Sequence, residues 1–237
     1  MSNTIFLVKF VEKEQYAIDF VSGKLYCNTL RTIKSLESDG RRGRADKNEG
    51  TVAWFQPGLG RLELVGMDVT DDLSGPVQLQ KLWLDDLHVF CLYAGQTETV
   101  GLGNATCESI EPLRRELLIP EATMELGEFA VVVKNVPTFL ARARAAAKEA
   151  GYRFARGLVQ YYDPNIFHGS FLDVESVFRK QAYYRHQREF RLVMYAGPSR
   201  GAPLWMHLGD LSDITLVLPS ADLNGPKFLG GDLEVRI

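Results

Sequence analysis

The sequence is poor in cysteine and lacks the spacings that hold a structural metal ion. Cys27, Cys91 and Cys107 are the only cysteines among 237 residues, and three thiols cannot all pair with one another. Cys27 and Cys91 lie in apolar, strand-like runs, as buried thiols of cytoplasmic proteins do. No Cys-x-x-Cys or His-x-x-x-His spacing occurs. We therefore predict a cytoplasmic protein without a metal site.

The sequence also lacks a nucleotide-binding glycine fingerprint and a long apolar run. Gly58-Leu59-Gly60 and Gly101-Leu102-Gly103 are without the spacing and the following helix of a Rossmann or P-loop motif. The apolar run at residues 5–11 contains Lys9 and is too short for a signal-peptide core or a membrane span. We expect no membrane association.

Positive and negative residues are almost balanced over the chain as a whole. The formal net charge is −3 and the isoelectric point is near 5.9, which argues against non-specific coating of nucleic acid but leaves room for a local basic groove. Hydrophobic residues make up 46% and charged residues 24%, as in globular proteins with a real core. We expect residues 1–237 to form a single α+β domain with more strand than helix.

Hydrophobic periodicity predicts many short strands and a few helices. We expect strands at residues 1–11, 24–28, 51–56, 61–67, 77–83, 87–93, 129–134, 153–162, 190–195, 204–208, 214–218 and 233–237, and helices at 13–21, 30–37, 107–118 and 136–151. The strands at 51–56 and 61–67 are expected to pair as a hairpin. Residues 129–134 and 190–195 are almost continuously apolar, so both should be central strands, with helix 136–151 packed against one of them.

The segment at residues 38–50 has almost no apolar side chains, and we predict a surface loop. Its cations at residues 41–44, together with Lys47, Asn48 and Glu49, are expected at the rim of the main cleft, where the loop glycines would let a ligand approach closely. A polar loop without a ligand is the alternative.

A basic, aromatic segment at residues 178–195 surrounds a single acidic residue, Glu189. The surrounding cations are Arg179, Lys180, Arg185, Arg188 and Arg191. Gln187 lies two residues before Glu189, so on an extended chain the two side chains would face the same side. A carboxylate beside an amide suits a ribose hydroxyl or a developing oxocarbenium ion, and cations suit a pyrophosphate. The alternative is an ordinary edge strand whose charges face solvent.

Three separate motifs carry a resemblance to known families. They are Gly23-Lys24-Leu25-Tyr26-Cys27-Asn28, Gly43-Arg44-Ala45-Asp46-Lys47-Asn48-Glu49-Gly50 and Tyr184-Arg185-His186-Gln187-Arg188-Glu189-Phe190-Arg191-Leu192. In this order they resemble a large set of poorly characterised bacterial and phage domains found near abortive-infection genes. The third motif is also similar to the catalytic strand of ADP-ribosyltransferases, in which Gln or Glu stands two residues before a glutamate.

The resemblance implies roles for three residues. Glu189 would bind the nicotinamide-side ribose and support the oxocarbenium-like transition state, and Gln187 would position the acceptor. Tyr26 would pack against nicotinamide. From the residues alone, Tyr26 could stack on nicotinamide or on another base, or could be a half-buried strand aromatic.

The resemblance further implies that NAD is bound as a substrate. Lys9, Arg44 or Arg185 would pair with the pyrophosphate, and Glu49 and Tyr184 would complete the NAD-binding set. The arginine or histidine usually found on the first strand of the family is not evident, and Lys9 is the only cation there.

Two classes of function follow from these observations. The first is an ADP-ribosyltransferase or NAD glycohydrolase acting in phage–host conflict, with a pair of small mixed sheets and flanking helices, that transfers ADP-ribose to a protein, a nucleic acid or water. The second is a non-catalytic defence or counter-defence module that binds nucleic acid or a nucleotide signal through the basic aromatic segment. A structural interaction protein is a third possibility. The first class requires Glu189 and Tyr26 to face one concave pocket.

Overall fold

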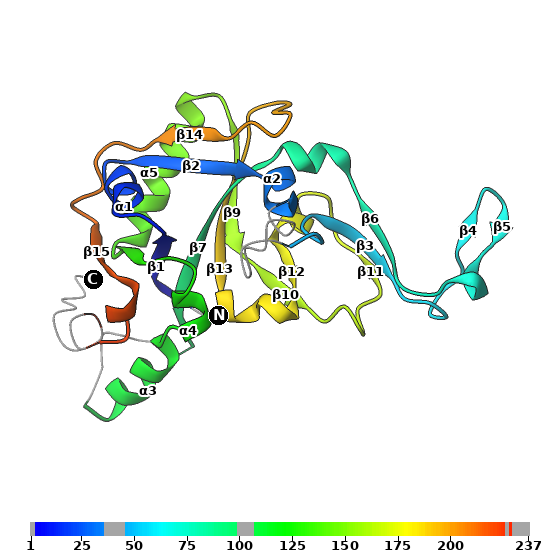
Figure 1. Ribbon diagram of the computed structural model, residues 1–237, viewed down its shortest axis with the longest axis horizontal. Helices are drawn as coiled ribbons and strands as arrows, with labels where there is room; N and C mark the ends of the chain where they lie inside the picture. Colours follow the sequence, from blue (N-terminus) through cyan, green and yellow to red (C-terminus); the bar gives the residue numbers. More distant parts are fainter. Residues whose placement is uncertain (1–2, 36–45, 99–106, 226–227, 229–237) are drawn as a thin grey trace.

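The computed structural model describes residues 3–35, 46–98, 107–225 and 228, and over these it has an α+β fold (Figure 1). The strands are β1 (Asn3–Val11), β2 (Lys24–Thr29), β3 (Thr51–Phe55), β4 (Glu63–Leu64), β5 (Met67–Asp68), β6 (Val77–Gln80), β7 (His88–Thr97), β8 (Phe129–Val133), β9 (Arg153–Leu158), β10 (Gln160–Tyr162), β11 (Gly169–Ser170), β12 (Arg179–Gln181), β13 (Glu189–Tyr195), β14 (Leu204–His207) and β15 (Thr215–Pro219). The helices are α1 (Glu14–Val21), α2 (Leu30–Ser35), α3 (Cys107–Leu117), α4 (Glu121–Met124) and α5 (Val136–Glu149), with short 3₁₀ turns at η2 (Thr70–Asp72), η3 (Leu82–Asp86), η5 (Glu175–Phe178), η6 (Ala182–Gln187) and η7 (Ser220–Asp222).

One large antiparallel sheet dominates the described residues. Its main path runs β14-β2-β7-β1-β8-β15, and β13 and β9 add to the other edge of β7. Three small sheets, β10-β12, β11-β3-β6 and β4-β5, accompany it. The α+β class is therefore confirmed, but the described strands form one eight-stranded sheet with small satellites rather than two sheets of similar size.

The two strands expected to be central are central. β8 lies between β1 and β15, and β13 lies between β7 and β9. Helix α5 packs against the same sheet, since Phe139 shares the largest core cluster with Val131 of β8 and Leu192 of β13. Asn135 caps the helix by accepting the backbone N–H of Thr138 at 3.0 Å. The reading of β13 as a solvent-facing edge strand is therefore wrong.

The large sheet divides along one edge of β7. β2 pairs with the first two residues of β7, and β1 pairs with the last five. Between these pairings, in the part of the chain that the structure describes, β7 residues 90–92 pair on this side with neither strand. The sheet therefore opens between β1 and β2, and the strand edges on both sides of the opening are available to line a cavity.

The predicted hairpin between residues 51–56 and 61–67 is wrong. β3 pairs instead with β6 and β11, and the intervening chain forms its own small hairpin, β4-β5, which projects from the body as an arm (Figure 1). Residues 57–76 are called the arm below. The arm is held together locally: Val69 donates its backbone N–H to the Leu62 carbonyl at 3.0 Å.

The strand predicted at residues 153–162 is also divided. β9 pairs with β13, whereas β10 pairs in parallel with β12. Val159 separates the two and donates its backbone N–H to the Glu189 carbonyl at 2.8 Å. The strand predicted at residues 233–237 lies outside the described residues.

None of the helices in the described part of the chain combines the length and the apolar character that crossing a bilayer requires. The longest of them, α5, has 14 residues and packs against the large sheet.

Candidate functional site

A cavity of about 760 Å³ occupies the opening between β1 and β2. Consecutive residues 8–13 and 89–93 line it, so it runs along the edges of the strands rather than over one face of them. Tyr26 and Glu189 both line it as well. We call this space the split cavity. Its size lies within the range of small-molecule and cofactor sites.

Strand alternation explains why Tyr26 and Glu189 meet. On β2, Leu25 and Cys27 enter the largest core cluster, so Tyr26 points to the opposite face of the sheet. On β13, Phe190 enters the same core cluster, so Glu189 also points to the opposite face. The two side chains therefore share one face and one cavity, as the first class of function requires.

Four buried charged side chains form an ion cluster at the wall of the split cavity: Glu49, Lys180, Glu189 and Arg191. Arg191 donates to both oxygens of Glu49, at 2.6 and 2.7 Å, and its Nε donates to Glu189 Oε2 at 2.8 Å. Lys180 Nζ donates to Glu189 Oε1 at 2.5 Å and lies 3.6 Å from Glu49. The cluster holds two positive and two negative charges, so each buried charge is compensated.

The ion cluster corrects the expected role of the loop before β3. Glu49 is 0% exposed and Asp46 1%, so these two side chains pack inward, whereas Lys47 between them is exposed. Asp46 Oδ1 accepts the backbone N–H of Asn48 at 2.9 Å, and Gly50 adopts a φ of +68°, which turns the chain into β3. Arg44 and the other cations at residues 41–44 lie outside the described residues.

The cluster also corrects the expected role of the basic segment. Lys180 and Arg191 are 3% and 1% exposed, and both are committed to internal ion pairs rather than to a ligand pyrophosphate. Sequence reasoning missed this because their partner Glu49 is 142 residues away from Arg191 along the chain. The only local signal was the strict alternation that puts Glu189 and Arg191 on one face.

Electrostatics keep the carboxylate of Glu189 ionised. Burial alone would raise its pKa, but Arg191 and Lys180 beside it outweigh burial and hold the pKa well below its usual range. Burial would also lower the pKa of Lys180, and Glu189 and Glu49 instead hold that pKa above its usual value. Asp46 behaves differently, because burial and then the neighbouring charge of Glu49 raise its pKa to about 6.

Gln187 reaches Glu189 by a route other than the one predicted. Residues 182–187 form the 3₁₀ turn η6, and Arg188 has a left-handed backbone with a φ of 37°, so the two side chains do not sit on one extended strand. They still converge, because Lys180 Nζ donates to Gln187 Oε1 at 2.8 Å as well as to Glu189. Tyr184 lies over the same ammonium, with its ring centroid 4.4 Å from Nζ.

Lys9 spans the opening of the sheet. Its Nζ donates to the Cys91 carbonyl at 2.9 Å and lies 4.3 Å from the centroid of the Phe90 ring. This contact joins β1 to the stretch of β7 that neither β1 nor β2 covers. Burial raises the pKa of both Cys91 and Cys27 to about 12, so neither thiol is a nucleophile near neutral pH.

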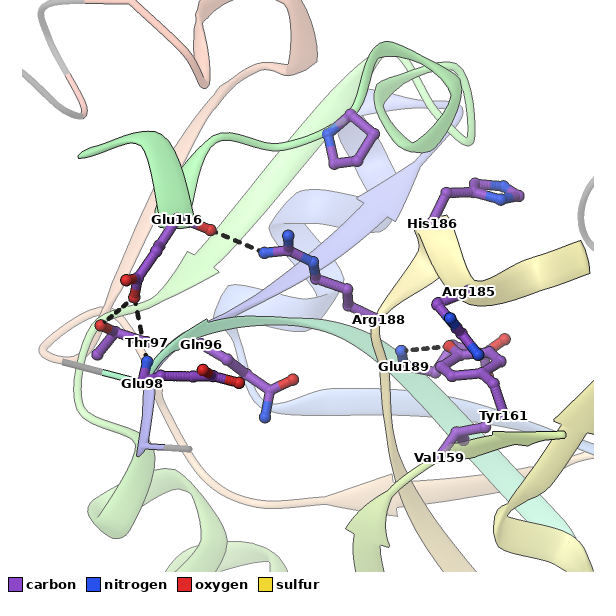
Figure 2. A pocket seen from close by; sticks show the side chains of 11 residues that line it. Gln96, Thr97, Glu98, Glu116, Val159, Tyr161, Arg185, His186, Arg188 and Glu189 are labelled. Carbon is purple, nitrogen blue, oxygen red and sulfur yellow. Dashed lines mark hydrogen bonds between the residues drawn. The ribbon is translucent and has the colours of Figure 1, made fainter. Parts of the chain in front are cut away.

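A second cavity, of about 710 Å³, also borders Glu189 (Figure 2). Arg188 reaches from the start of β13 across this space and donates to the Glu116 carbonyl at 2.8 Å, and the Tyr161 hydroxyl accepts the backbone N–H of Glu189 at 2.9 Å. Arg185 lines this cavity and not the split cavity. Of the expected pyrophosphate-binding residues, the structure thus brings Lys9 together with Tyr26 and keeps Arg185 apart from them.

Residues 197–201 carry the Gly-x-Ser-x-Gly spacing of a hydrolase nucleophile. Ser199 Oγ donates to Asp86 Oδ1 at 2.9 Å, and the Ser199 backbone N–H contacts the same oxygen at 3.1 Å. Strand β14 follows the segment, where a nucleophile elbow would continue into a helix. The serine therefore holds a turn against Asp86, and among the described residues no hydrogen bond joins Ser199 to a histidine.

Comparisons of the chain with protein-family models, curated proteins and solved structures found no match. The geometry of the split cavity and its ion cluster is therefore the basis for the function proposed below.

Proposed function

We propose that this chain is an NAD-consuming enzyme, an ADP-ribosyltransferase or NAD glycohydrolase acting in phage–host conflict, built on an ADP-ribosyltransferase-like variant of the α+β fold. One observation carries the proposal: an ionised, buried carboxylate, Glu189, and an aromatic side chain, Tyr26, line the same cavity of about 760 Å³. Both residues stand in motifs that resemble those of ADP-ribosyltransferases and related domains.

Glu189 has the electrostatic environment that this chemistry needs. Breaking the bond between nicotinamide and ribose C1′ leaves positive charge on the ribose, and a fixed carboxylate in a dry site stabilises such charge more strongly than water does. Lys180 and Arg191 hold both oxygens of Glu189 in place. Glu49 compensates these cations, so the ion cluster adds no net positive charge that would oppose a ribosyl cation.

The proposed reaction is a substitution at ribose C1′. Nicotinamide leaves with the electron pair of the C1′–N bond, and the oxygen of water or a nucleophilic atom of a macromolecule forms the new bond and loses its proton. Gln187, whose Oε1 shares the Lys180 ammonium with Glu189, lies where it can orient the attacking group. With water the products are ADP-ribose, nicotinamide and a proton.

A second candidate function is a non-catalytic nucleotide-binding module. The observation that favours it is that Lys180 and Arg191 already occupy both oxygens of Glu189, as they would in a purely structural ion cluster. Nucleic-acid binding through the same two cations is not favoured, since both are buried. Tyr183, at 81% exposure, is the accessible aromatic of the basic segment.

Release of nicotinamide from NAD tests the proposal. The parent should release nicotinamide, and Glu189→Gln should lower the rate per folded molecule on the order of 100-fold, because an amide keeps the shape of the carboxylate but not its charge. Tyr26→Ala should raise KM more than it lowers kcat, since stacking acts on substrate and transition state alike.

The matched control is Glu49→Gln. It removes a carboxylate from the same ion cluster and should destabilise the fold to a similar extent, with thermal melts reporting the folded fraction. It should nevertheless retain a larger share of the nicotinamide release than Glu189→Gln. Equal losses in the two variants, or no release by the parent with NAD alone, with nucleic acid or with cell lysate, would favour the non-catalytic module.

A further inference from the structure

Tyr26 is half of an aromatic pair at the split cavity. Its partner is Trp205, which stands directly opposite on β14; the ring centroids are 4.9 Å apart and the planes meet at 61°. Both side chains line the cavity, and they are 44% and 49% exposed. Trp205 lies on the same face as Tyr26 because its neighbour Met206 enters the core on the other side. Two large aromatic rings are thus left open to a ligand.

The aromatic pair lies well away from the ion cluster. The strand order across this face is β14, β2, β7 and β13, and neighbouring strands are about 4.8 Å apart. β2 pairs with β7 only at residues 28 and 29, and the sheet opens beyond them. Tyr26 on β2 is therefore at least two strand spacings, roughly 10 Å or more, from Glu189 on β13, and Trp205 is one spacing further. A ring stacked on the pair therefore lies toward the β14 side of the cavity, away from the strand that carries Glu189.

This separation fixes which end of NAD the pair can hold. Nicotinamide is bonded directly to the ribose carbon that reacts, whereas adenine is separated from that carbon by two riboses and the pyrophosphate. If C1′ lies at Glu189, nicotinamide lies beside the ion cluster and only adenine reaches the aromatic pair. Besides the ion cluster, three cations among the described residues line the cavity and could meet the pyrophosphate: Lys9, which crosses the opening to the Cys91 carbonyl, Lys13 and Lys24.

We propose that Tyr26 and Trp205 form the adenine-binding end of the split cavity, and that Trp205 is a binding residue. This inference rests on the proposed function for its choice of NAD, and it replaces the expected stacking of Tyr26 on nicotinamide. Aromatic side chains stack on any base, so stacking alone does not select adenine. The pair selects the adenine end of the ligand because of its position in the cavity.

The test uses three probes, AMP, ADP-ribose and nicotinamide mononucleotide. Isothermal titration calorimetry measures the affinity of each variant, and the intrinsic fluorescence of the tryptophans locates the binding site in those that keep Trp205. The chain has three tryptophans, Trp54, Trp83 and Trp205, so Trp205→Leu identifies the signal of the pair, and Trp83→Phe serves as a control at a partly exposed tryptophan outside the cavity. AMP and ADP-ribose should quench the parent and the control variant. Trp205→Leu should bind AMP on the order of 10-fold more weakly, and Trp205→Phe should recover most of that loss.

The affinity for nicotinamide mononucleotide should be unchanged in Trp205→Leu. If this affinity falls while AMP binding stays at the parent level, the assignment of the two ends is overturned. Parent protein that does not bind AMP or ADP-ribose also overturns it, even if nicotinamide is released from NAD. Trp205-dependent binding of AMP without nicotinamide release supports the adenine end and rejects the proposed catalysis, so the two proposals fail separately.

Discussion

Arg191 links the two buried carboxylates of the ion cluster, Glu49 and Glu189. Its guanidinium contacts two carboxylates and the Val177 carbonyl from the middle of β13. Lysine cannot reproduce this planar set of contacts, so Arg191→Lys should lower the free energy of unfolding by about 2 to 4 kcal/mol. Urea denaturation measures the loss.

The control for this substitution is Arg142→Lys. Arg142 also makes two contacts with one carboxylate, Asp213, at 2.7 and 2.8 Å, but this pair is open to solvent. Its substitution should cost less than about 1 kcal/mol. If the two substitutions lowered the free energy of unfolding equally, burial would not increase the contribution of the ion cluster to stability.

Asp46 should make stability depend on pH. Burial and Glu49 raise its pKa to about 6, whereas an unfolded aspartate titrates near pH 4. Asp46 thus binds its proton more tightly in the folded state, so its contribution to stability is fully present below about pH 4 and is lost as pH rises through about 6.

Asp46→Asn should remove this dependence. The amide oxygen can still accept the Asn48 backbone N–H, and the neutral side chain carries no buried charge. Relative to the parent, the variant should gain nothing near pH 4 and roughly 2 to 3 kcal/mol at pH 7 and above. Unfolding curves measured between pH 4 and 8 test this; parallel curves for parent and variant would contradict it.

The sequence predicts which residues belong to the candidate site, but it does not predict which side chains they contact. Glu189, Tyr26 and Gln187 were identified by residue type and spacing, and the structure gathers all three at one cavity. The pairing of Arg191 with Glu49 could not be predicted, because it depends on the loop before β3 folding inward from a distant part of the chain. A local sequence pattern shows that a segment is charged, but it does not show which distant side chain forms the ion pair.

At the scale of single elements, the turn of the β4-β5 hairpin contains an unfavourable residue. Val65 and Gly66 are its two central residues, with φ values of 51° and 79°, as in a type I′ turn. A β-branched residue is strained in this conformation, which asparagine accepts readily. Val65 is also 100% exposed, so packing does not offset the strain.

Val65→Asn should therefore stabilise the hairpin. We expect about 1 kcal/mol, seen as amide hydrogen exchange several-fold slower at Val69, whose N–H donates to the Leu62 carbonyl within the arm. Val65→Thr separates the effect of polarity from that of the backbone, because it remains β-branched, and it should leave the exchange rate near that of the parent. Faster exchange in Val65→Asn would reject the strained turn.

Element boundaries differed from prediction where a distant strand decided the pairing. Gly58 turns the chain after β3, with a φ of 73°, but β3 pairs with β6 rather than with the nearer segment. Likewise, Val159 breaks a run that alternates regularly in sequence, because its N–H is used by the Glu189 carbonyl of β13. Alternation of apolar and polar residues identifies a strand, whereas the strand with which it pairs depends on burial across the whole sheet.

At the scale of the whole molecule, the α+β class and the central positions of β8 and β13 were predictable from their apolar content. The division of the sheet at β7 was not. It arises because β1 and β2 share one edge of a ten-residue strand and use different parts of it, a long-range arrangement without a local signature. The split cavity is a product of this topology.

The arm differs from the rest of the molecule in its charge. It carries Arg61 and four acidic residues, a formal charge of −3 that equals that of the entire chain, so the remaining residues sum to zero. The same arm exposes the apolar side chains of Leu64, Val65 and Met67. Acidic side chains therefore accompany an exposed apolar tip, and we expect repulsion between the arms of two molecules to oppose contact between their tips.

This protection should weaken as ions screen it. The screening length falls from about 10 Å at 0.1 M salt to about 3 Å at 1 M, so the repulsion between two arms is lost while their apolar tips remain attractive. We expect weak self-association that grows with salt, detectable by sedimentation, and that is reduced by Val65→Asn. We therefore expect the arm to set how self-association of this protein depends on salt.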